Sequence, residues 1–210
     1  ADMAVRFLPA RPGGNLLDVG CGRGDWLAFM SERGWWCEGV EPDPAAAEAA
    51  SRQGVRVHTG TLDEQQFQDN SFDAVSLCHV LEHVPNPVDL LRECKRILRP
   101  GGRLVMVTPN SEGLGIRVFG ADWRGLEPPR HLHLFNIPTL RRAIGDAGLR
   151  VETLKAVTTS RYTFQESWAL RHGRPAEEGA RAARFWAGVD FAARAFVSGL
   201  GEAVVAVARA

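Results

Sequence analysis

Three glycines alternate at positions 20, 22 and 24, directly after the apolar run Asn15 to Val19, and a helical pattern starts at Asp25. This order predicts a strand, a glycine turn and a helix. The chain must bend sharply there and let a ligand approach bare backbone, and glycine tolerates both demands. The N–H groups that open the helix face the turn, where a polar or anionic ligand group can sit. The stretch therefore predicts a site for a nucleotide-like ligand.

A carboxylate at position 41 adds a second signal. Glu41 ends the next apolar run, 35–40, and Pro42 follows at once. An acidic residue at the end of the second strand can accept hydrogen bonds from two ribose hydroxyls. The alternative is a surface carboxylate at a strand end, but the preceding glycine turn favours the role in ligand binding.

The glycine spacing distinguishes two classes of ligand. Dinucleotide enzymes use G-x-G-x-x-G, whereas this chain has G-x-G-x-G, with Asp25 where the last glycine would stand and Asp18 before the first. The motif Asp-x-Gly-x-Gly-x-Gly resembles motif I of class I S-adenosylmethionine (SAM) methyltransferases. That resemblance implies SAM as cofactor and S-adenosylhomocysteine as product. NAD is the alternative cofactor.

The resemblance also implies a set of cofactor-binding residues. Thr61 or Asp63 would receive the adenine amino group, although Thr61 departs from the commoner Asp and Asp63 could equally be a carboxylate at a helix N-terminus. The full set expected around the cofactor is Asp18, Gly20, Cys21, Gly22, Gly24, Glu41, Pro42, Thr61, Leu62, Asp63, Cys78 and His79.

The elements that position these residues alternate along the chain. Short connections and right-handed crossovers then give an α/β fold, a doubly wound, mostly parallel Rossmann-like sheet with its ligand crevice at the carboxyl ends of the strands. An antiparallel last strand is expected at 203–208, beside a strand at 149–157, with a helical insertion over 158–201 before it. We expect one domain over 1–210. The other expected strands are 15–19, 35–40, 55–58, 72–78 and 103–107, and the expected helices are 25–33, 45–52, 87–98 and 138–147.

Further blocks extend the resemblance over about residues 15–157. They are Phe72-Asp73, the run 79–87, Leu-Arg-Pro-Gly-Gly at 98–102, and Pro129 to Phe135 with Trp123 ahead of it. The last block is similar to bacterial class I methyltransferases often found with glycan or natural-product biosynthesis. We expect the loop 109–137 to lie on the substrate side.

Methyl transfer to a hydroxyl requires a base, and histidine is the natural candidate near neutral pH. His79 follows a strand end and is expected in the crevice. His131 and His133 alternate, so in an extended segment both would point one way, with Leu132 and Leu134 in the core. The candidate catalytic residues are therefore His79, His131 and His133, and His83 is expected to be structural.

No metal ion is assigned from the sequence. One alternative remains, because His79, Glu82 and His83 have i, i+3, i+4 spacing and would share a face of a helical turn. Two imidazoles and a carboxylate can bind a divalent metal. Quinone O-methyltransferases resemble this block, with Glu where His79 stands, and metal assistance is implied for some of them.

These observations predict a SAM-dependent methyltransferase that acts on a small molecule, with an oxygen acceptor slightly preferred. Two alternatives stay open. One is a catalytically weak SAM-binding regulatory protein. The other is an NAD-dependent oxidoreductase, against which the spacing at Asp25 argues.

The amino-acid composition indicates which binding partners and which cellular compartment to expect. The 210 residues carry 25 basic and 25 acidic side chains, so no basic excess points to nucleic acid. The four cysteines form no C-x-x-C pair and are expected to be reduced thiols in a cytoplasmic protein. We expect no signal peptide and no transmembrane segment. A homodimer through the insertion is plausible, since apolar residues recur there at helical spacing: Phe185, Val189, Ala193, Phe196 and Leu200.

Overall fold

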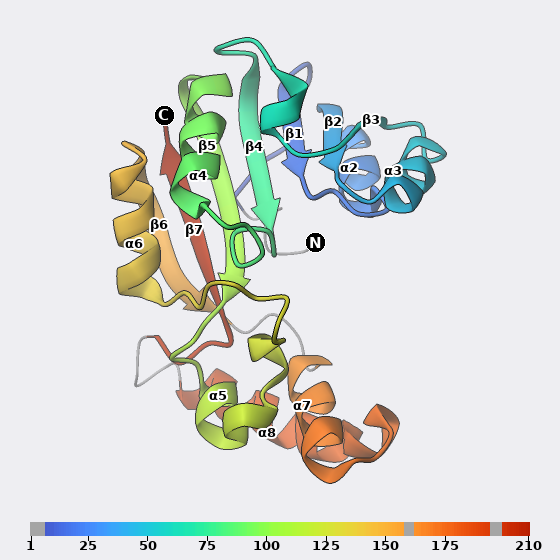
Figure 1. The fold of residues 1–210 in the computed structure, drawn as a ribbon, viewed down its shortest axis with the longest axis vertical. Coiled ribbons are helices and arrows are strands. Elements are labelled where there is room, and N and C mark those ends of the chain that lie inside the picture. Colours follow the sequence, from blue (N-terminus) through green and yellow to red (C-terminus); the bar gives the residue numbers. More distant parts are fainter. Residues whose placement is uncertain (1–6, 158–161, 194–198) are drawn as a thin grey trace.

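The computed structural model describes residues 7–157, 162–193 and 199–210, and within these ranges the strands form a seven-stranded sheet in the order β3-β2-β1-β4-β5-β7-β6 (Figure 1). The first five strands are parallel, and β7 is antiparallel to both β5 and β6. The predicted fold class is confirmed. The strands are β1 (Asn15–Val19), β2 (Trp36–Glu41), β3 (Arg56–Thr59), β4 (Phe72–Cys78), β5 (Leu98–Pro109), β6 (Arg150–Val157) and β7 (Ala203–Arg209).

Helices follow the strands as the alternating pattern predicts, with ends shifted by one or two residues. One boundary differs more. The Arg-Pro-Gly-Gly segment, expected to end a helix ahead of a strand, lies within β5, which already begins at Leu98. The helices are α2 (Asp25–Ser31), α3 (Pro44–Ser51), α4 (Pro87–Ile97), α5 (Leu114–Phe119), α6 (Ile137–Asp146), α7 (Tyr162–His172) and α8 (Ala180–Ala193), with short 3-10 turns η1 (Asp63–Gln65), η2 (Gly120–Asp122), η3 (Arg124–Leu126) and η4 (Ala176–Gly179).

Alternate residues of the central strands build two separate cores, one on each face of the sheet. Leu17 and Val75 belong to the core that includes the apolar stripes of α4 and α6. Leu16 and Ala74, their neighbours in sequence, face the other way and pack with Leu27 and Met30 of α2. Because both faces are covered, these strands are almost continuously apolar, as parallel strands require.

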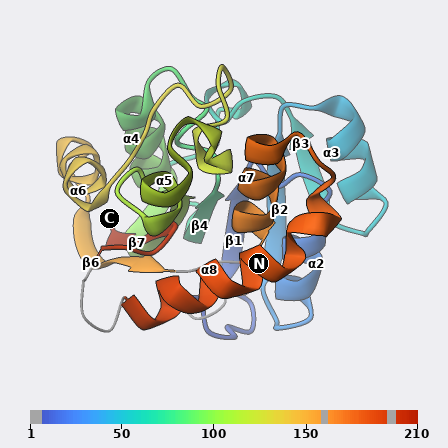
Figure 2. The same cartoon turned by 90° about the horizontal axis from the view of Figure 1, so that it is seen from below.

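A helical body lies beyond the arrowheads of β4 and β5, at the carboxyl edge of the sheet (Figures 1 and 2). It joins α5 and the 3-10 turns of the 109–137 segment to α7 and α8 of the insertion, and its centre is the buried Trp123. Gly115 and Gly125 lie against the Trp123 ring, where an added Cβ would come within 2.3 Å and 2.4 Å of ring atoms. Two segments far apart in sequence therefore form one small core at the edge where parallel strands place their ligands.

The structure also bears on the predictions about transmembrane segments, cysteines and the apolar face of the insertion. Among the described residues, no helix is long and apolar enough to cross a membrane. The four cysteines are free thiols. On α8, Phe185 and Phe191 are exposed. Phe196, which was expected on the same apolar face, lies outside the described residues, and the homodimer stays a prediction.

Asp73 holds the amino ends of three strands together, on the side of the sheet away from the helical body. Its carboxylate accepts hydrogen bonds from the Asn15 backbone N–H (2.9 Å) and from the Arg99 guanidinium (2.6 Å), and it pairs with Arg11 at 2.9 Å. Burial opposes ionisation, but these donors and cations prevail and lower the pKa of Asp73 below its usual range. The Phe72-Asp73 part of the sequence signature is therefore structural.

We predict that Asp73→Asn lowers the free energy of unfolding at pH 7 by about 1–3 kcal/mol, because it removes a charge that three partners share. Since the folded-state pKa is lowered, this stabilisation exists above the unfolded value near 4 and disappears as the pH falls through the folded value. Urea unfolding at pH 7 and at about pH 3 measures the difference. Asp69→Asn is the control, since the Asp69 side chain is 68% exposed. An equal loss in both variants would contradict the role of Asp73.

Candidate active site

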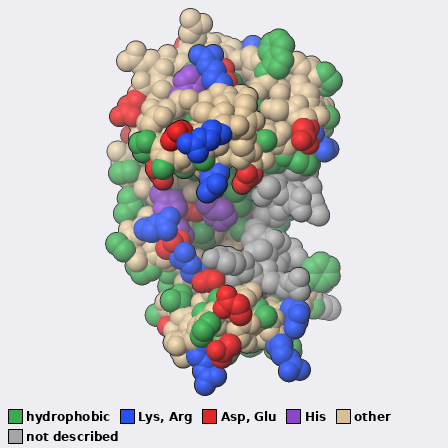
Figure 3. All heavy atoms as spheres, turned by 90° about the vertical axis from the view of Figure 1, so that its right-hand side faces the viewer, with side chains coloured by type: hydrophobic (Ala, Val, Ile, Leu, Met, Phe, Trp, Pro, Cys, Tyr) green, Lys and Arg blue, Asp and Glu red, His purple; other side chains and the backbone are tan. Residues whose placement is uncertain are grey.

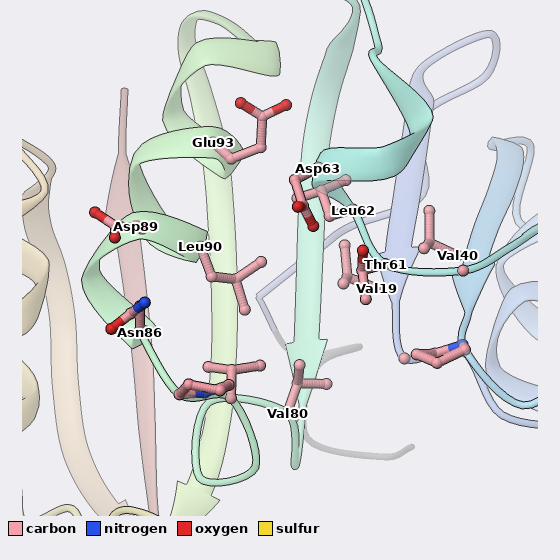
Figure 4. A pocket seen from close by; sticks show the side chains of 15 residues that line it. Val19, Val40, Thr61, Leu62, Asp63, Val80, Asn86, Asp89, Leu90 and Glu93 are labelled. Atoms are coloured by element: carbon pink, nitrogen blue, oxygen red, sulfur yellow. The ribbon is translucent and has the colours of Figure 1, made fainter.

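A cavity of about 430 Å³ lies at the carboxyl ends of β1, β2 and β4, beneath α4 (Figure 4). Five of the residues predicted around the cofactor line it: Gly20, Pro42, Thr61, Leu62 and Asp63. Sequence reasoning missed the opposite wall, which comes from the segment after β4 and from α4. Those residues are Val80, Val84, Pro85, Asn86, Asp89, Leu90 and Glu93.

The glycine turn and Glu41 are joined directly. The Gly22 N–H donates to Glu41 Oε2 at 2.8 Å, and the Asp43 N–H donates to Oε1 at 3.0 Å. The glycines have different surroundings. An added Cβ would lie 2.6 Å from Val80 at Gly20 and 2.8 Å from Ala50 at Gly24, but would meet open space at Gly22. Gly22 is thus the glycine of the turn whose missing side chain leaves room for a ligand.

Asp18 lies buried just before this turn and accepts a hydrogen bond from the Ser76 hydroxyl at 2.6 Å. Burial raises the pKa of Asp18 to about 7, with the Ser76 hydrogen bond opposing the shift and the charge of Glu41 adding to it. Seven of the predicted cofactor residues do not line this cavity: Asp18, Cys21, Gly22, Gly24, Glu41, Cys78 and His79. Cys21 packs in the core against Gly39, and Cys78 is exposed at the end of β4.

A second cavity, of about 440 Å³, lies between the sheet and the helical body. The turn after β4 is the wall between the two cavities: His79 and His83 line the second, whereas Val80 and Val84 line the first. In Figure 3, histidine, arginine and acidic side chains gather at this waist of the molecule. The remaining lining residues are Pro109, Trp123, Arg124, Gly125, Glu127, Arg130, His131, Thr163, Glu202 and Ala203.

His79 is held in an unusual backbone conformation at this wall. Its φ is +57°, in the left-handed region that non-glycine residues seldom adopt, and its N–H donates to the Val107 carbonyl at 2.9 Å. The ring Nδ1 lies 3.0 Å from Glu82 Oε1. A carboxylate accepts hydrogen bonds, so we assign the proton to Nδ1, which leaves the Nε2 lone pair free. The His79 side chain is 49% exposed and Glu82 is 1% exposed.

The other histidines occupy different environments. The His131 side chain is 5% exposed, with Nδ1 2.8 Å from the Gly125 carbonyl and Nε2 3.4 Å from Glu127 Oε2. The His83 Nδ1 lies 3.0 Å from the Arg130 carbonyl. His133 lies outside the lining of the second cavity, with Nε2 3.1 Å from the Pro85 carbonyl.

The expected alternation of the 131–134 segment is wrong. Leu132 and Leu134 are 54% and 47% exposed, because the segment is irregular rather than a strand. It is fixed instead by the Leu132 and His133 N–H groups, which both donate to the Glu82 backbone carbonyl. The proposed face shared by His79, Glu82 and His83 also differs: in the described residues, Glu82 and His83 cluster with His131.

A doubly wound sheet with a glycine turn and a carboxylate at adjacent strand ends defines the class of nucleoside-binding α/β proteins. Residues 1–154 match the family model described as "Methyltransferase domain". The chain therefore belongs to the methyltransferase-domain family. It is an enzyme, a SAM-dependent methyltransferase, and its cofactor is SAM rather than NAD.

Relatives and solved structures agree with this family. The chain is 31% identical over 159 residues to a ubiquinone biosynthesis O-methyltransferase of Pseudomonas paraeruginosa, covering 70% of this chain and 68% of that protein. It is 32% identical over 170 residues to an uncharacterized 37.1 kDa protein in transposon TN4556 of Streptomyces fradiae; that match covers 72% of this chain but only 48% of the relative. A SAM dependent methyltransferase from Archaeoglobus fulgidus shares the fold, with a TM-score of 0.70 at 17% identity, over 100% of this chain and 91% of that one.

We predict that Gly22→Val abolishes SAM binding. Its side chain would enter the open space beside the turn, and the φ of +55° disfavours any Cβ, at a cost of about 1–2 kcal/mol. Calorimetric titration with SAM measures the loss, and circular dichroism checks the fold. The control is Gly54→Val, at a second glycine with positive φ and open space, which lies in the connection between α3 and β3 rather than in the glycine turn. SAM affinity within twofold of the wild type in a folded Gly22→Val protein would refute this role.

We also predict that SAM affinity falls as the pH drops below about 7. The raised pKa leaves Asp18 increasingly protonated there, whereas the positive sulfonium of SAM favours the ionised carboxylate. The dissociation constant should rise by up to about tenfold per pH unit below the pKa. Calorimetry from pH 6 to pH 8 tests this, and Asp18→Asn should remove the dependence. The same slope in Asp18→Asn would assign the titration to another group.

Proposed function

We propose that this methyltransferase transfers the methyl group of SAM to a hydroxyl oxygen of a small molecule, with His79 as the base. SAM occupies the first cavity and the acceptor occupies the second. The single observation that carries the proposal is the pair formed by His79 and the buried Glu82, at a wall common to both cavities.

The charges next to the first cavity and the apolar surfaces that line it support this placement of SAM. Glu41 accepts hydrogen bonds from the ribose hydroxyls, which replace or join the N–H groups that it now binds. Asp18 places negative charge near the sulfonium. Val40 and Leu62 cover the adenine faces, with Asp63 available to its amino group.

Methyl transfer is an in-line displacement at the methyl carbon. The S–CH3 bond breaks as the O–CH3 bond forms, the acceptor proton moves to Nε2 of His79, and S-adenosylhomocysteine leaves. Glu82 is a positioning residue: it holds the imidazole by Nδ1 and stabilises the imidazolium that forms. Most of the remaining rate acceleration comes from aligning the acceptor oxygen with the methyl group in a site that excludes water.

The helical body completes the acceptor side of the proposal. The 109–137 segment contributes Trp123, Arg124 and Glu127 to the second cavity, and the insertion contributes Thr163. Both segments are therefore assigned to acceptor recognition within one domain. The oxygen acceptor is also supported by the relative named a ubiquinone biosynthesis O-methyltransferase.

The experiment is a screen of phenols and alcohols with SAM, measured by S-adenosylhomocysteine formation, followed by kinetics of His79→Gln. We predict that this variant lowers kcat by about 10²–10⁴, the usual contribution of a general base. Its SAM dissociation constant should stay within about threefold of the wild type, because His79 lines the second cavity rather than the first.

His172→Gln is the matched control, since His172 lies on α7, outside the lining of both cavities, with Nδ1 near the Trp168 carbonyl. It should keep the wild-type kcat. Equal losses of SAM affinity and turnover in His79→Gln would move His79 into the cofactor site. Tight SAM binding without turnover on any phenol or alcohol would contradict the proposed hydroxyl acceptor.

A further inference from the structure

Three side chains meet beside the second cavity, which two of them, His83 and His131, line. One ligand atom each of Glu82, His83 and His131 lies within 4.8 Å of the others. The two rings are 4.7 Å apart between centroids and nearly edge-to-face. The cluster joins the turn after β4 to a segment almost fifty residues later, so the sequence spacing that suggested His79 as a third member could not reveal it.

The backbone fixes which ring nitrogens face the cluster. His83 and His131 each have Nδ1 against a backbone carbonyl, those of Arg130 (3.0 Å) and Gly125 (2.8 Å). A carbonyl oxygen can only accept, so each Nδ1 carries the proton and each Nε2 keeps its lone pair. Histidines that ligate metals are oriented in this way, through a hydrogen bond from the other ring nitrogen.

Glu82 supplies negative charge to the same place. Its side chain is 1% exposed, with Oε1 near the His79 ring and Oε2 accepting from the Thr108 hydroxyl at 3.1 Å. A buried carboxylate beside two imidazole lone pairs is an arrangement that a cation stabilises strongly. Oε1 of the nearby Glu127 pairs with Arg124 and Arg130, at 2.8 Å and 2.7 Å, and its Oε2 lies 3.4 Å from Nε2 of His131.

We propose that Glu82, His83 and His131 bind a divalent transition-metal ion such as Zn²⁺. Two imidazoles and one carboxylate suit such an ion better than Mg²⁺ or Ca²⁺, which prefer oxygen ligands. With bond lengths of about 2.0–2.2 Å, the ligand atoms of a tetrahedral ion lie roughly 3.3–3.6 Å apart, so side-chain movements of up to about 1.3 Å close the site.

The open side of this ion faces the second cavity, beside His79. Its role there rests on the proposed function: the ion binds the acceptor oxygen, lowers the pKa of that hydroxyl and places it for transfer, while His79 takes the proton. An acceptor with two neighbouring oxygens would chelate the ion and bind better than one with a single hydroxyl.

The test is metal binding by the full chain, freed of metal with a chelator, in the absence of SAM and acceptor. Calorimetric titration with Zn²⁺ should show one ion per chain with micromolar affinity or better, and Mg²⁺ at the same concentrations should not bind. Co²⁺ bound in place of Zn²⁺ gives an absorption spectrum that reports its ligands. This spectrum should indicate nitrogen and oxygen ligands and lack a thiolate charge-transfer band.

His131→Ala and His83→Ala should each weaken Zn²⁺ binding at least about tenfold, with SAM affinity unchanged because neither residue lines the first cavity. His133→Ala is the matched control: it lies two residues away, with Nε2 against the Pro85 carbonyl, and should bind Zn²⁺ like the wild type. The proposal would be overturned if Zn²⁺ did not bind stoichiometrically, or if His131→Ala bound Zn²⁺ as tightly as the wild type. A thiolate charge-transfer band in the Co²⁺ spectrum would also overturn it.

The metal site and the proposed function can fail independently of each other. His79-dependent methylation by a protein that binds no metal would remove the ion and leave the methyltransferase assignment. Stoichiometric Zn²⁺ binding that requires His131, in a protein that methylates no hydroxyl, would keep the metal site and remove the oxygen acceptor.

Discussion

The wall between the two cavities depends on the hydrogen bonds that the buried Glu82 carboxylate accepts. A charge at 1% exposure is tolerable only with hydrogen-bond partners. Its side chain is bound by His79 and by Thr108 of β5, and its backbone carbonyl accepts from Leu132 and His133. One residue thereby joins the end of β4, the middle of the sheet and the segment that leads out of the helical body. Removing its charge would release His79 and Thr108, whereas the hydrogen bonds from Leu132 and His133 to its backbone carbonyl would remain.

This arrangement explains why His79 can occupy a left-handed conformation. A positive φ costs a non-glycine residue about 1–2 kcal/mol, and such strain persists only where the surroundings determine it. The Val107 carbonyl fixes the His79 backbone and Glu82 fixes its ring. The strain turns the imidazole toward the second cavity while the next residue, Val80, faces the first.

The sequence predicted the cofactor side better than the acceptor side, and the reason is physical. Gly20, Gly22 and Glu41 are neighbours because parallel strands end at one edge, so local pattern and topology suffice to place them. The second cavity depends on contacts between 79–83, 123–131 and α7, which no periodicity encodes. The one usable local signal was the i, i+3 spacing of His79 and Glu82, which do pair.

The same distinction accounts for the specific errors. Leu132 and Leu134 were expected in the core because the alternation of 131–134 suggested a strand, but a segment tied to Glu82 by its backbone N–H groups need not bury its side chains. The cavity wall from α4 was missed because its apolar stripe had already been assigned to the core. Asn86, Asp89 and Glu93 lie on the α4 side of the cavity, across from Thr61 (Figure 4).

The fold divides the chemistry between its two halves. The sheet supplies the glycine turn and Glu41, which depend only on strand order, so cofactor recognition is independent of the helical body. The helical body supplies Trp123, Gly125 and Thr163 to the second cavity, and its own core around Trp123 stabilises it separately from the sheet. In the proposed function, changes in that body therefore alter the acceptor while the cofactor site stays intact. The turn from His79 to Pro85 is the exception, because it lines both cavities and its geometry must satisfy both ligands.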